Sequence, residues 1–186
     1  EYVPSDIFSA IGENLEVSAT KRRDTVGSSY INVDASFRRG MIKAAYNNYP
    51  RVISTVDVVP CSTESNNILM GKKAGETTWR FIGGFTDPSS PSNEFDASKE
   101  LFEEANLIVA PEDMLYLFSV NVDDWRYRKT PEVKVRTNVF GCKLPKNQPF
   151  KAGDDIAELG LVPLDTDLDE INPVHREIFR RLCYGK

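Results

Sequence analysis

Residues 83–107, GGFTDPSSPSNEFDASKELFEEANL, constrain the fold of this 186-residue chain more than any other stretch. A glycine pair ends an apolar run, a turn-rich loop follows, and a helix is predicted beyond it. At about 100° per residue, one side of this helix carries acids and the other carries apolar residues. The acids are Asp96, Glu100, Glu103 and Glu104, and the apolar residues are Phe95, Ala97, Leu101, Phe102 and Ala105. The pattern predicts one face that packs against a core and one that holds cations.

Local signals predict where this helix begins and ends. Ser90 suits the N-cap with Pro91 at the first helical position, and Asn106 suits the left-handed conformation that ends a helix. Like charges four residues apart destabilise a helix by tenths of a kcal/mol per pair, and Lys99 offsets this only in part. Clustered carboxylates supply the oxygen ligands that Mg²⁺ or Mn²⁺ prefers. Taken alone, such a cluster is also typical of a solvated helix surface.

The remaining chain predicts alternating strands and helices. Strands are expected at residues 51–59, 67–73, 78–82, 114–122, 134–144 and 156–164, and helices at 5–15, 36–46 and 172–183, with an exposed loop at 18–29. This order favours an α/β (α+β) fold in which a mixed sheet lies between helices. Residues 51–186 are expected to form this domain, and residues 1–50 an N-terminal helical extension that serves a homodimer contact.

Composition excludes several classes of protein. The net charge of −5 argues against general nucleic-acid binding, which needs a basic excess. No apolar run approaches the ~20 residues that span a bilayer. Three scattered cysteines indicate neither a disulfide framework nor a zinc site, so a cytoplasmic setting is expected. The chain begins at Glu1 without methionine or an apolar signal segment, a start compatible with a truncated or processed form.

The glycine pair and the acidic helix together resemble the box of the Nudix hydrolase family. That box reads G, five residues, E, seven residues, then R-E-bulky-x-E-E-x-G-bulky, and Glu100, Leu101, Glu103, Glu104 and Leu107 match it. The resemblance covers about residues 51–182. Lys99 stands where the family has arginine, Asn106 replaces the last glycine, and the loop before the helix is one residue longer.

The resemblance implies an α/β/α sandwich that hydrolyses the pyrophosphate bond of a nucleoside diphosphate linked to another group, X, with Mg²⁺ or Mn²⁺ as cofactor. Glu100, Glu103 and Glu104 are then the expected metal ligands and catalytic acids, with the Gly84 carbonyl as a further ligand. Lys99 takes the catalytic position of the family's arginine, although lysine cannot form the arginine's bidentate bond. A general base is expected either from one of the three glutamates or from a later loop, where the candidates are Asp154, Asp155 and Glu158.

Substrate contacts are predicted from basic and aromatic residues. Arginines can hold phosphate or ribose and Trp125 can stack on a base, the candidates being Arg80, Trp125, Arg126, Arg128 and Arg136. An arginine-bearing loop before a strand with Arg136 and Thr137 favours ADP-ribose-like or nucleotide-sugar substrates by family resemblance. The only histidine, His175, is interpreted as a packing or capping residue. The alternative function is a Nudix-like module that senses a nucleotide with little turnover, which Lys99 and the altered loop would suit.

Overall fold

The structure, a computed structural model, describes residues 35–47, 50–130 and 132–184. The chain separates into two compact units, Glu1–Tyr49 and Pro50–Lys186. In the first unit, helix α2 spans Ala35–Asn47, close to the predicted 36–46. The helix predicted at 5–15 and the loop predicted at 18–29 lie outside the described residues. The role of the N-terminal residues as a dimerising extension stays a prediction.

A mixed six-stranded sheet forms the second unit. Its strands are β1 Arg51–Cys61, β2 Asn67–Lys73, β3 Ile82–Phe85, β4 Leu115–Val122, β5 Val133–Lys143 and β6 Ile156–Pro163. The strand order is β4-β5-β1-β2-β6, and β3 pairs with β1 outside this path. β1 and β5 run parallel and the other pairs are antiparallel. The predicted mixed sheet is therefore confirmed.

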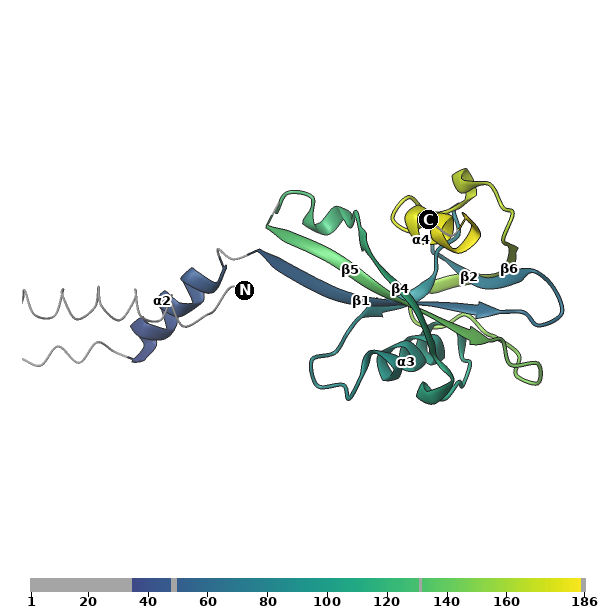
Figure 1. The fold of residues 1–186 in the computed structure, drawn as a ribbon, viewed down its shortest axis with the longest axis horizontal. Helices are drawn as coiled ribbons and strands as arrows, with labels where there is room; N and C mark the ends of the chain where they lie inside the picture. The colour runs from purple at the N-terminus through teal and green to yellow at the C-terminus, as the bar shows by residue number, and fades with distance from the viewer. Residues whose placement is uncertain (1–34, 48–49, 131, 185–186) are drawn as a thin grey trace, which may run out of the picture. The chain divides into compact units, whose positions relative to one another are not determined.

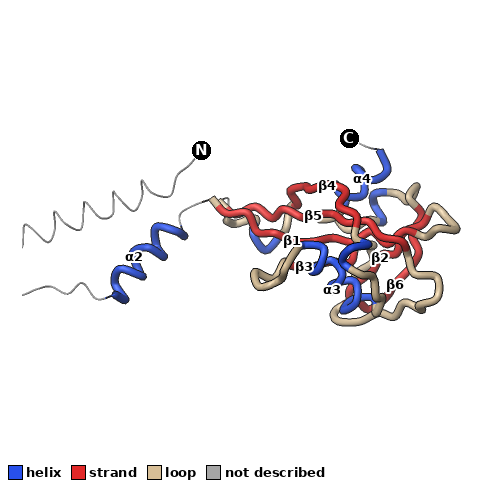
Figure 2. The backbone as a smooth tube through the Cα atoms, turned by 60° about the horizontal axis from the view of Figure 1, so that its bottom comes forward, coloured by secondary structure: helices blue, strands red, loops and turns tan. Residues whose placement is uncertain are grey.

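Two helices cover the two faces of this sheet (Figure 1). Helix α3, Asn93–Ala105, lies on one face, and helix α4, Arg176–Tyr184, lies on the other, as the tube in Figure 2 also shows. Because strand side chains alternate, β1 sends Val56 and Val58 into the core under α3 and Val59 into the core under α4. Short 3₁₀ turns complete the unit: η1 Pro111–Asp113, η2 Trp125–Tyr127 and η3 Leu168–Glu170. The fold is the predicted α/β/α sandwich.

Three element boundaries differ from the prediction. β1 was predicted to stop before Pro60 but continues through it to Cys61. Proline removes only one backbone N–H donor, and the residues on either side of it keep their register with β5. The strand predicted at 78–82 begins at Ile82 and runs through the glycine pair, while Trp79 makes only an isolated bridge. Helix α4 begins at Arg176, because Asn172 caps a preceding turn by accepting a hydrogen bond from the Val174 N–H.

Helix α3 also starts later than predicted. Its N-cap is Ser92, whose hydroxyl accepts from the Phe95 N–H, while the Ser90 hydroxyl donates to the Asp96 carboxylate instead. The left-handed end at Asn106 is confirmed, with φ 55° and ψ 32°. Ser90 is thus drawn away from the cap because a buried carboxylate needs its hydrogen bond.

The two predicted faces of α3 were only partly right. Ala97, Leu101 and Ala105 are fully buried, because residues four apart form one stripe against the sheet. Phe95 and Phe102 are exposed, and the buried stripe is flanked by an acid, Glu104, that the prediction placed on the open face. Asp96, another acid predicted on the open face, is buried as well. The helix is therefore rotated so that two of its acids are buried, and one of them, Glu104, points toward the glycine pair.

Candidate functional site

A cavity of about 500 Å³ lies where α3, β3 and the loop before β6 meet. Strand β3 supplies Gly83 and Gly84, and α3 supplies Glu100 and Glu104. Further acids from the loop before β6 and basic residues from β2 and the segment before β3 also line it: Asp154, Asp155, Lys73 and Arg80. The glycine pair and the acidic helix, which are close in sequence, thus meet beside a polar cavity that both of them line.

Glu104 is held in place by the first glycine. Glu104 is only 3% exposed, and its Oε2 accepts a hydrogen bond of 2.9 Å from the Gly83 N–H. Gly83 has φ 156°, and a Cβ there would lie 2.1 Å from the Val56 carbonyl oxygen. Only glycine allows β3 to approach β1 this closely, so the N–H that orients Glu104 depends on it.

The second glycine makes room for Glu100. A Cβ at Gly84 would lie 2.6 Å from Glu100 Oε1, so this carboxylate rests directly against the Gly84 backbone. The carboxylates of Glu100 and Glu104, one helical turn apart, therefore reach the same stretch of β3. The pairing of Glu100 with the Gly84 carbonyl as ligands of one cation stays a prediction.

Asp154 and Asp155 join Glu104 in a three-acid group whose ligand atoms lie within 4.8 Å of one another. The loop is fastened to the end of α3 by the Gly153 N–H, which donates to the Glu104 carbonyl at 3.0 Å. Lys73 forms an ion pair with Asp155. Several carboxylate oxygens converging on one point are the ligand type that Mg²⁺ or Mn²⁺ prefers, so the residues fit such an ion.

Glu103 and Lys99 lie at the edge of this arrangement. Lys99 Nζ is 3.8 Å from Glu103 Oε1, and both side chains are nearly half exposed. Neither residue lines the cavity. The predicted metal ligands are thus divided: Glu100, Glu104 and Gly84 line the cavity, while Glu103 lies beside it, paired with the lysine that replaces the family's arginine.

The inward acids have raised pKa values. Burial is the main cause for both: it raises the pKa of Glu104 to about 8, against the opposing effect of the Gly83 N–H, and the pKa of Glu100 to about 7, with Glu103 adding to the rise. A bound divalent cation would lower both pKa values again, because it favours the charged carboxylates.

Metal-free protein is expected to lose stability through Glu104 as the pH rises from about 4.5 to about 8. In this window the unfolded chain has released the proton that the folded state still binds, so the contribution of Glu104 is greatest below the unfolded pKa. In thermal unfolding with chelator, the unfolding temperature of wild type should fall relative to that of Glu104→Gln as the pH rises. Added Mg²⁺ should restore the unfolding temperature of wild type but not change that of the variant. Parallel pH profiles for the two proteins would contradict this.

The predicted substrate residues fall into two groups. Arg80, Trp125 and Arg126 line the cavity. Asp124 accepts a close hydrogen bond from Arg126 Nη2 at 2.5 Å, the guanidinium lies 4.5 Å from the centre of the Phe85 ring, and Trp125 is 71% exposed. An exposed tryptophan beside a fixed arginine can stack on a base near a phosphate.

Two predicted arginines and one predicted base lie outside the cavity. Arg136 bonds Asn121 on the face of β5 opposite the cavity-lining Val135, because neighbouring strand residues point to opposite faces. Arg128 pairs with Asp123 and lines a separate cavity of about 410 Å³. Glu158 pairs with Lys72 at 3.6 Å on β6. The prediction that all three acids lie on one loop was therefore wrong for Glu158, and of the three only Asp154 and Asp155 line the main cavity.

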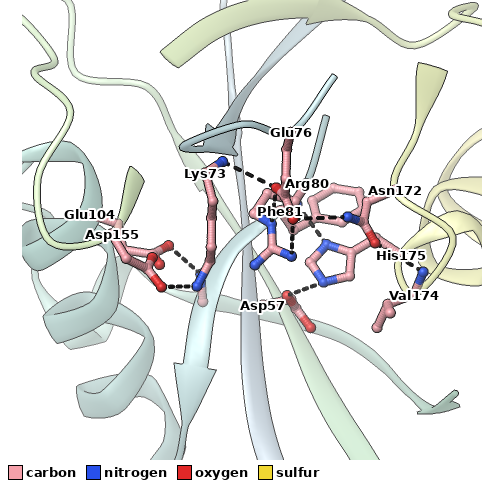
Figure 3. A network of polar contacts seen from close by, with 11 residues as sticks. Asp57, Lys73, Glu76, Arg80, Phe81, Glu104, Asp155, Asn172, Val174 and His175 are labelled. Atoms are coloured by element: carbon pink, nitrogen blue, oxygen red, sulfur yellow. Dashed lines mark hydrogen bonds and ion pairs between the residues drawn. The ribbon is translucent and has the colours of Figure 1, made fainter. Parts of the chain in front are cut away.

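Sequence reasoning missed a polar wall opposite α3, formed by Asp57, Glu76 and Asn172 (Figure 3). Asp57 is buried, accepts from the Thr137 hydroxyl at 2.5 Å, and has its pKa raised to about 7 by burial. An acid in the middle of the β-branched run VDVV was the signal that could have found it.

His175 belongs to this wall and keeps its predicted structural role. Its Nδ1 accepts from the Phe81 N–H at 2.8 Å, and its ring stacks on Phe81 with centroids 5.7 Å apart. Burial lowers its pKa to about 3, so the ring is neutral at physiological pH. The hydrogen bond to Nδ1 places the remaining proton on Nε2, which lies 3.9 Å from Asp57 Oδ1.

Solved structures share this fold. The chain is similar to a MutT/nudix family protein from Enterococcus faecalis (22% identity, 66% of this chain and 49% of that chain, TM-score 0.50). It is also similar to the NUDIX domain of Shewanella oneidensis NrtR complexed with ADP ribose (17% identity, 75% of this chain and 95% of that chain, TM-score 0.56). A third similar structure is the Escherichia coli dihydroneopterin triphosphate pyrophosphohydrolase (15% identity, 74% of this chain and 99% of that chain, TM-score 0.58). The match spans about half of the E. faecalis chain.

The sequence matches no protein-family model and no curated protein. The likeness to solved structures nevertheless defines the class of fold: the second unit has the Nudix fold. The resemblance found in the sequence is therefore confirmed at the level of the fold.

Among the described residues, none of the helices is long and apolar enough to cross a membrane.

Proposed function

We propose that this protein hydrolyses the pyrophosphate bond of a nucleoside diphosphate linked to X, with Mg²⁺ or Mn²⁺ as cofactor. The observation that carries the proposal is the convergence of Glu100, Glu104, Asp154 and Asp155 on the cavity that also holds Arg80 and Arg126. Carboxylates alone would repel a pyrophosphate, whereas carboxylates that hold cations can bind one. The combination of acids and arginines therefore suits a pyrophosphate that binds together with a divalent cation.

Glu100, Glu104 and the Gly84 carbonyl are the proposed metal ligands, with Glu103 available from the neighbouring position on α3. When bound, the metal supplies charge neutralisation of the phosphoryl oxygens and a lower pKa for the attacking water. A new bond forms between the water oxygen and one phosphorus, and the bond from that phosphorus to the bridging oxygen breaks. The displaced phosphate keeps the bridging oxygen and its electron pair.

The proton released by water needs a carboxylate acceptor in the cavity. Among the helix glutamates Glu100 suits this role, because its carboxylate lines the cavity against the Gly84 backbone, where the attacking water would be held. Asp154 is the second candidate, since the carboxylate of Asp155 is engaged by Lys73. Glu158 lies outside the cavity and pairs with Lys72, so it does not suit this role.

ADP-ribose-like or nucleotide-sugar compounds are the proposed substrates. Arg80 and Arg126 can hold the two phosphates, and Trp125 can stack on the base. The Shewanella NUDIX domain complexed with ADP ribose supports this choice, whereas the E. coli neighbour acts on a pterin triphosphate, so the fold alone does not select the substrate. A cytoplasmic homodimer remains the prediction for location and assembly.

Turnover of at least one compound is expected from a panel of ADP-ribose, nucleotide sugars, dinucleotides and nucleoside triphosphates, assayed with Mg²⁺ and with Mn²⁺. Release of a nucleoside monophosphate identifies cleavage of the pyrophosphate bond, and chelator should abolish it. No product from any compound with either metal would remove the hydrolase proposal.

The second candidate function is nucleotide sensing with little turnover. It is favoured by the Lys99–Glu103 pair, because lysine offers one point of attachment where the family's arginine offers a bidentate fork. If the protein is such a sensor, wild type should bind a panel compound with almost no turnover, and Lys99→Arg should raise turnover by about tenfold or more. Rapid turnover by wild type would exclude this alternative.

A further inference from the structure

The Glu76 carboxylate collects hydrogen bonds from three separate segments of the chain (Figure 3). It accepts from the Lys73 N–H at 3.1 Å, from Arg80 Nε and Nη2 at 2.9 and 3.0 Å, and from the Asn172 amide at 3.4 Å. These donors lie at the end of β2, in the segment before β3 and ahead of α4. Such a set of contacts fixes the Arg80 guanidinium in one orientation.

Only one edge of that guanidinium is used by Glu76. The side edge, Nε and Nη2, forms the bidentate pair, while the end edge carries Nη1 and the second hydrogen of Nη2. Within residues 50–130 and 132–184, no hydrogen bond joins Nη1 to another residue. Arg80 lines the cavity, and the end edge offers a two-point fork of the kind that binds phosphate oxygens.

Arg80 differs from the other cations around the cavity. Lys73 is engaged by Asp155, and the Arg126 side chain is 47% exposed, whereas the Arg80 side chain is 19% exposed. Arg80 is also paired, with Glu76, but this pairing leaves its end edge open. Charge interactions strengthen as water is excluded, so the open edge of Arg80 can bind an anion that enters this deep. In Figure 3 its guanidinium lies between Lys73 and His175.

We propose that Arg80 binds one phosphate of the substrate's pyrophosphate group, and that Glu76 is the positioning residue that holds Arg80 for this contact. The inference rests on the proposed function, since it takes the ligand to contain a pyrophosphate. It selects Arg80 from the arginines suggested by the sequence and assigns Glu76 a role that no motif indicated. A purely structural ion pair would explain the side edge of Arg80 but would make no use of its end edge.

The test is a calorimetric titration of the full chain with inorganic pyrophosphate at fixed Mg²⁺, and separately with Mg²⁺ alone. Arg80→Lys is expected to weaken pyrophosphate binding about tenfold, because lysine cannot form the fork. Glu76→Gln should weaken it too, and the double variant should be no weaker than Arg80→Lys, since both changes remove one interaction. Binding of Mg²⁺ alone should be unchanged.

The chain offers a matched control pair. Glu177 and Arg181 on α4 have the same four-residue spacing and a hydrogen bond of 3.1 Å, but they lie outside the cavity. Glu177→Gln and Arg181→Lys should leave pyrophosphate binding unchanged. Thermal unfolding of all variants measures any loss of folding.

Three results would overturn the inference: wild type that does not bind pyrophosphate, an Arg80→Lys variant that binds it as wild type does, or a Glu76→Gln variant that binds it more tightly. The last result would mean that Glu76 only repels the ligand. Failure of the proposed hydrolysis is a separate result, because pyrophosphate binding through Arg80 can be present in a protein that turns over no panel compound.

Discussion

Glu104→Gln is expected to lower kcat/KM for the best panel substrate by at least about a hundredfold, or roughly 2.7 kcal/mol of transition-state stabilisation. Glu104 is the most buried acid of the cavity and the member shared by α3 and the Asp154–Asp155 group. The amide has nearly the same shape and can still accept from the Gly83 N–H, but it lacks the negative charge that holds a divalent cation. Steady-state kinetics over a range of Mg²⁺ concentrations measure the effect.

Glu94→Gln is the matched control for this variant. Glu94 lies in the first turn of the same helix and does not line the cavity. The kcat/KM of the Glu94→Gln variant should therefore stay close to that of wild type. Higher Mg²⁺ should recover part of the loss in Glu104→Gln if the residue acts by holding the metal. Near-wild-type kcat/KM in Glu104→Gln would show that the buried acid has no part in the reaction.

Gly83→Ala is expected to destabilise the second unit by about 3 kcal/mol or more, at the upper end of single-residue effects. The added Cβ would lie 2.1 Å from the Val56 carbonyl oxygen and 2.9 Å from the Asp57 Cα, and both are backbone atoms that cannot move aside without breaking the β1–β3 pairing. The substitution would also displace the N–H that holds Glu104. Urea unfolding monitored by circular dichroism gives the free energy.

Gly75→Ala separates steric conflict from backbone preference. Gly75 has φ 81°, a conformation that also disfavours a side chain, but a Cβ there would meet no atom within 4 Å. Its substitution should therefore cost only about 1–2 kcal/mol. Equal losses at the two positions would mean that the close approach of β3 to β1 has no energetic weight.

Strand periodicity and end signals predicted much of the fold because they act over short distances. The β-branched run at β1 and the apolar runs at β4, β5 and β6 became strands close to their expected limits, and Asn106 ended α3 in the left-handed conformation. The matched box residues also indicated which acids to examine. These features depend on the chain within a few residues, where spacing and backbone preference are readable from sequence.

The wall opposite α3 was beyond such reasoning. Asp57, Glu76 and Asn172 come from segments that are far apart in the chain. They are brought together by the β1–β3 pairing, by the isolated bridges at Arg80 and Trp79, and by the contact of Asn172 with Glu76. The arginines could not be separated from one another by residue type either. Strand alternation sent Arg136 to the other face, while Glu76 fixed Arg80 at the cavity.

The sequence by itself determined the acidic helix, the glycine pair before it and hence the class of fold, because these lie within one continuous stretch at residues 83–107. Only the tertiary structure decided the rotation of α3, which buried Glu104 and left Glu103 beside Lys99 at the edge. Helical periodicity fixes which residues share a face, but it does not fix where that face points. Here packing of Ala97, Leu101 and Ala105 against the sheet set the buried face, and the close approach of β3 to β1 at Gly83 supplied the N–H that satisfies buried Glu104.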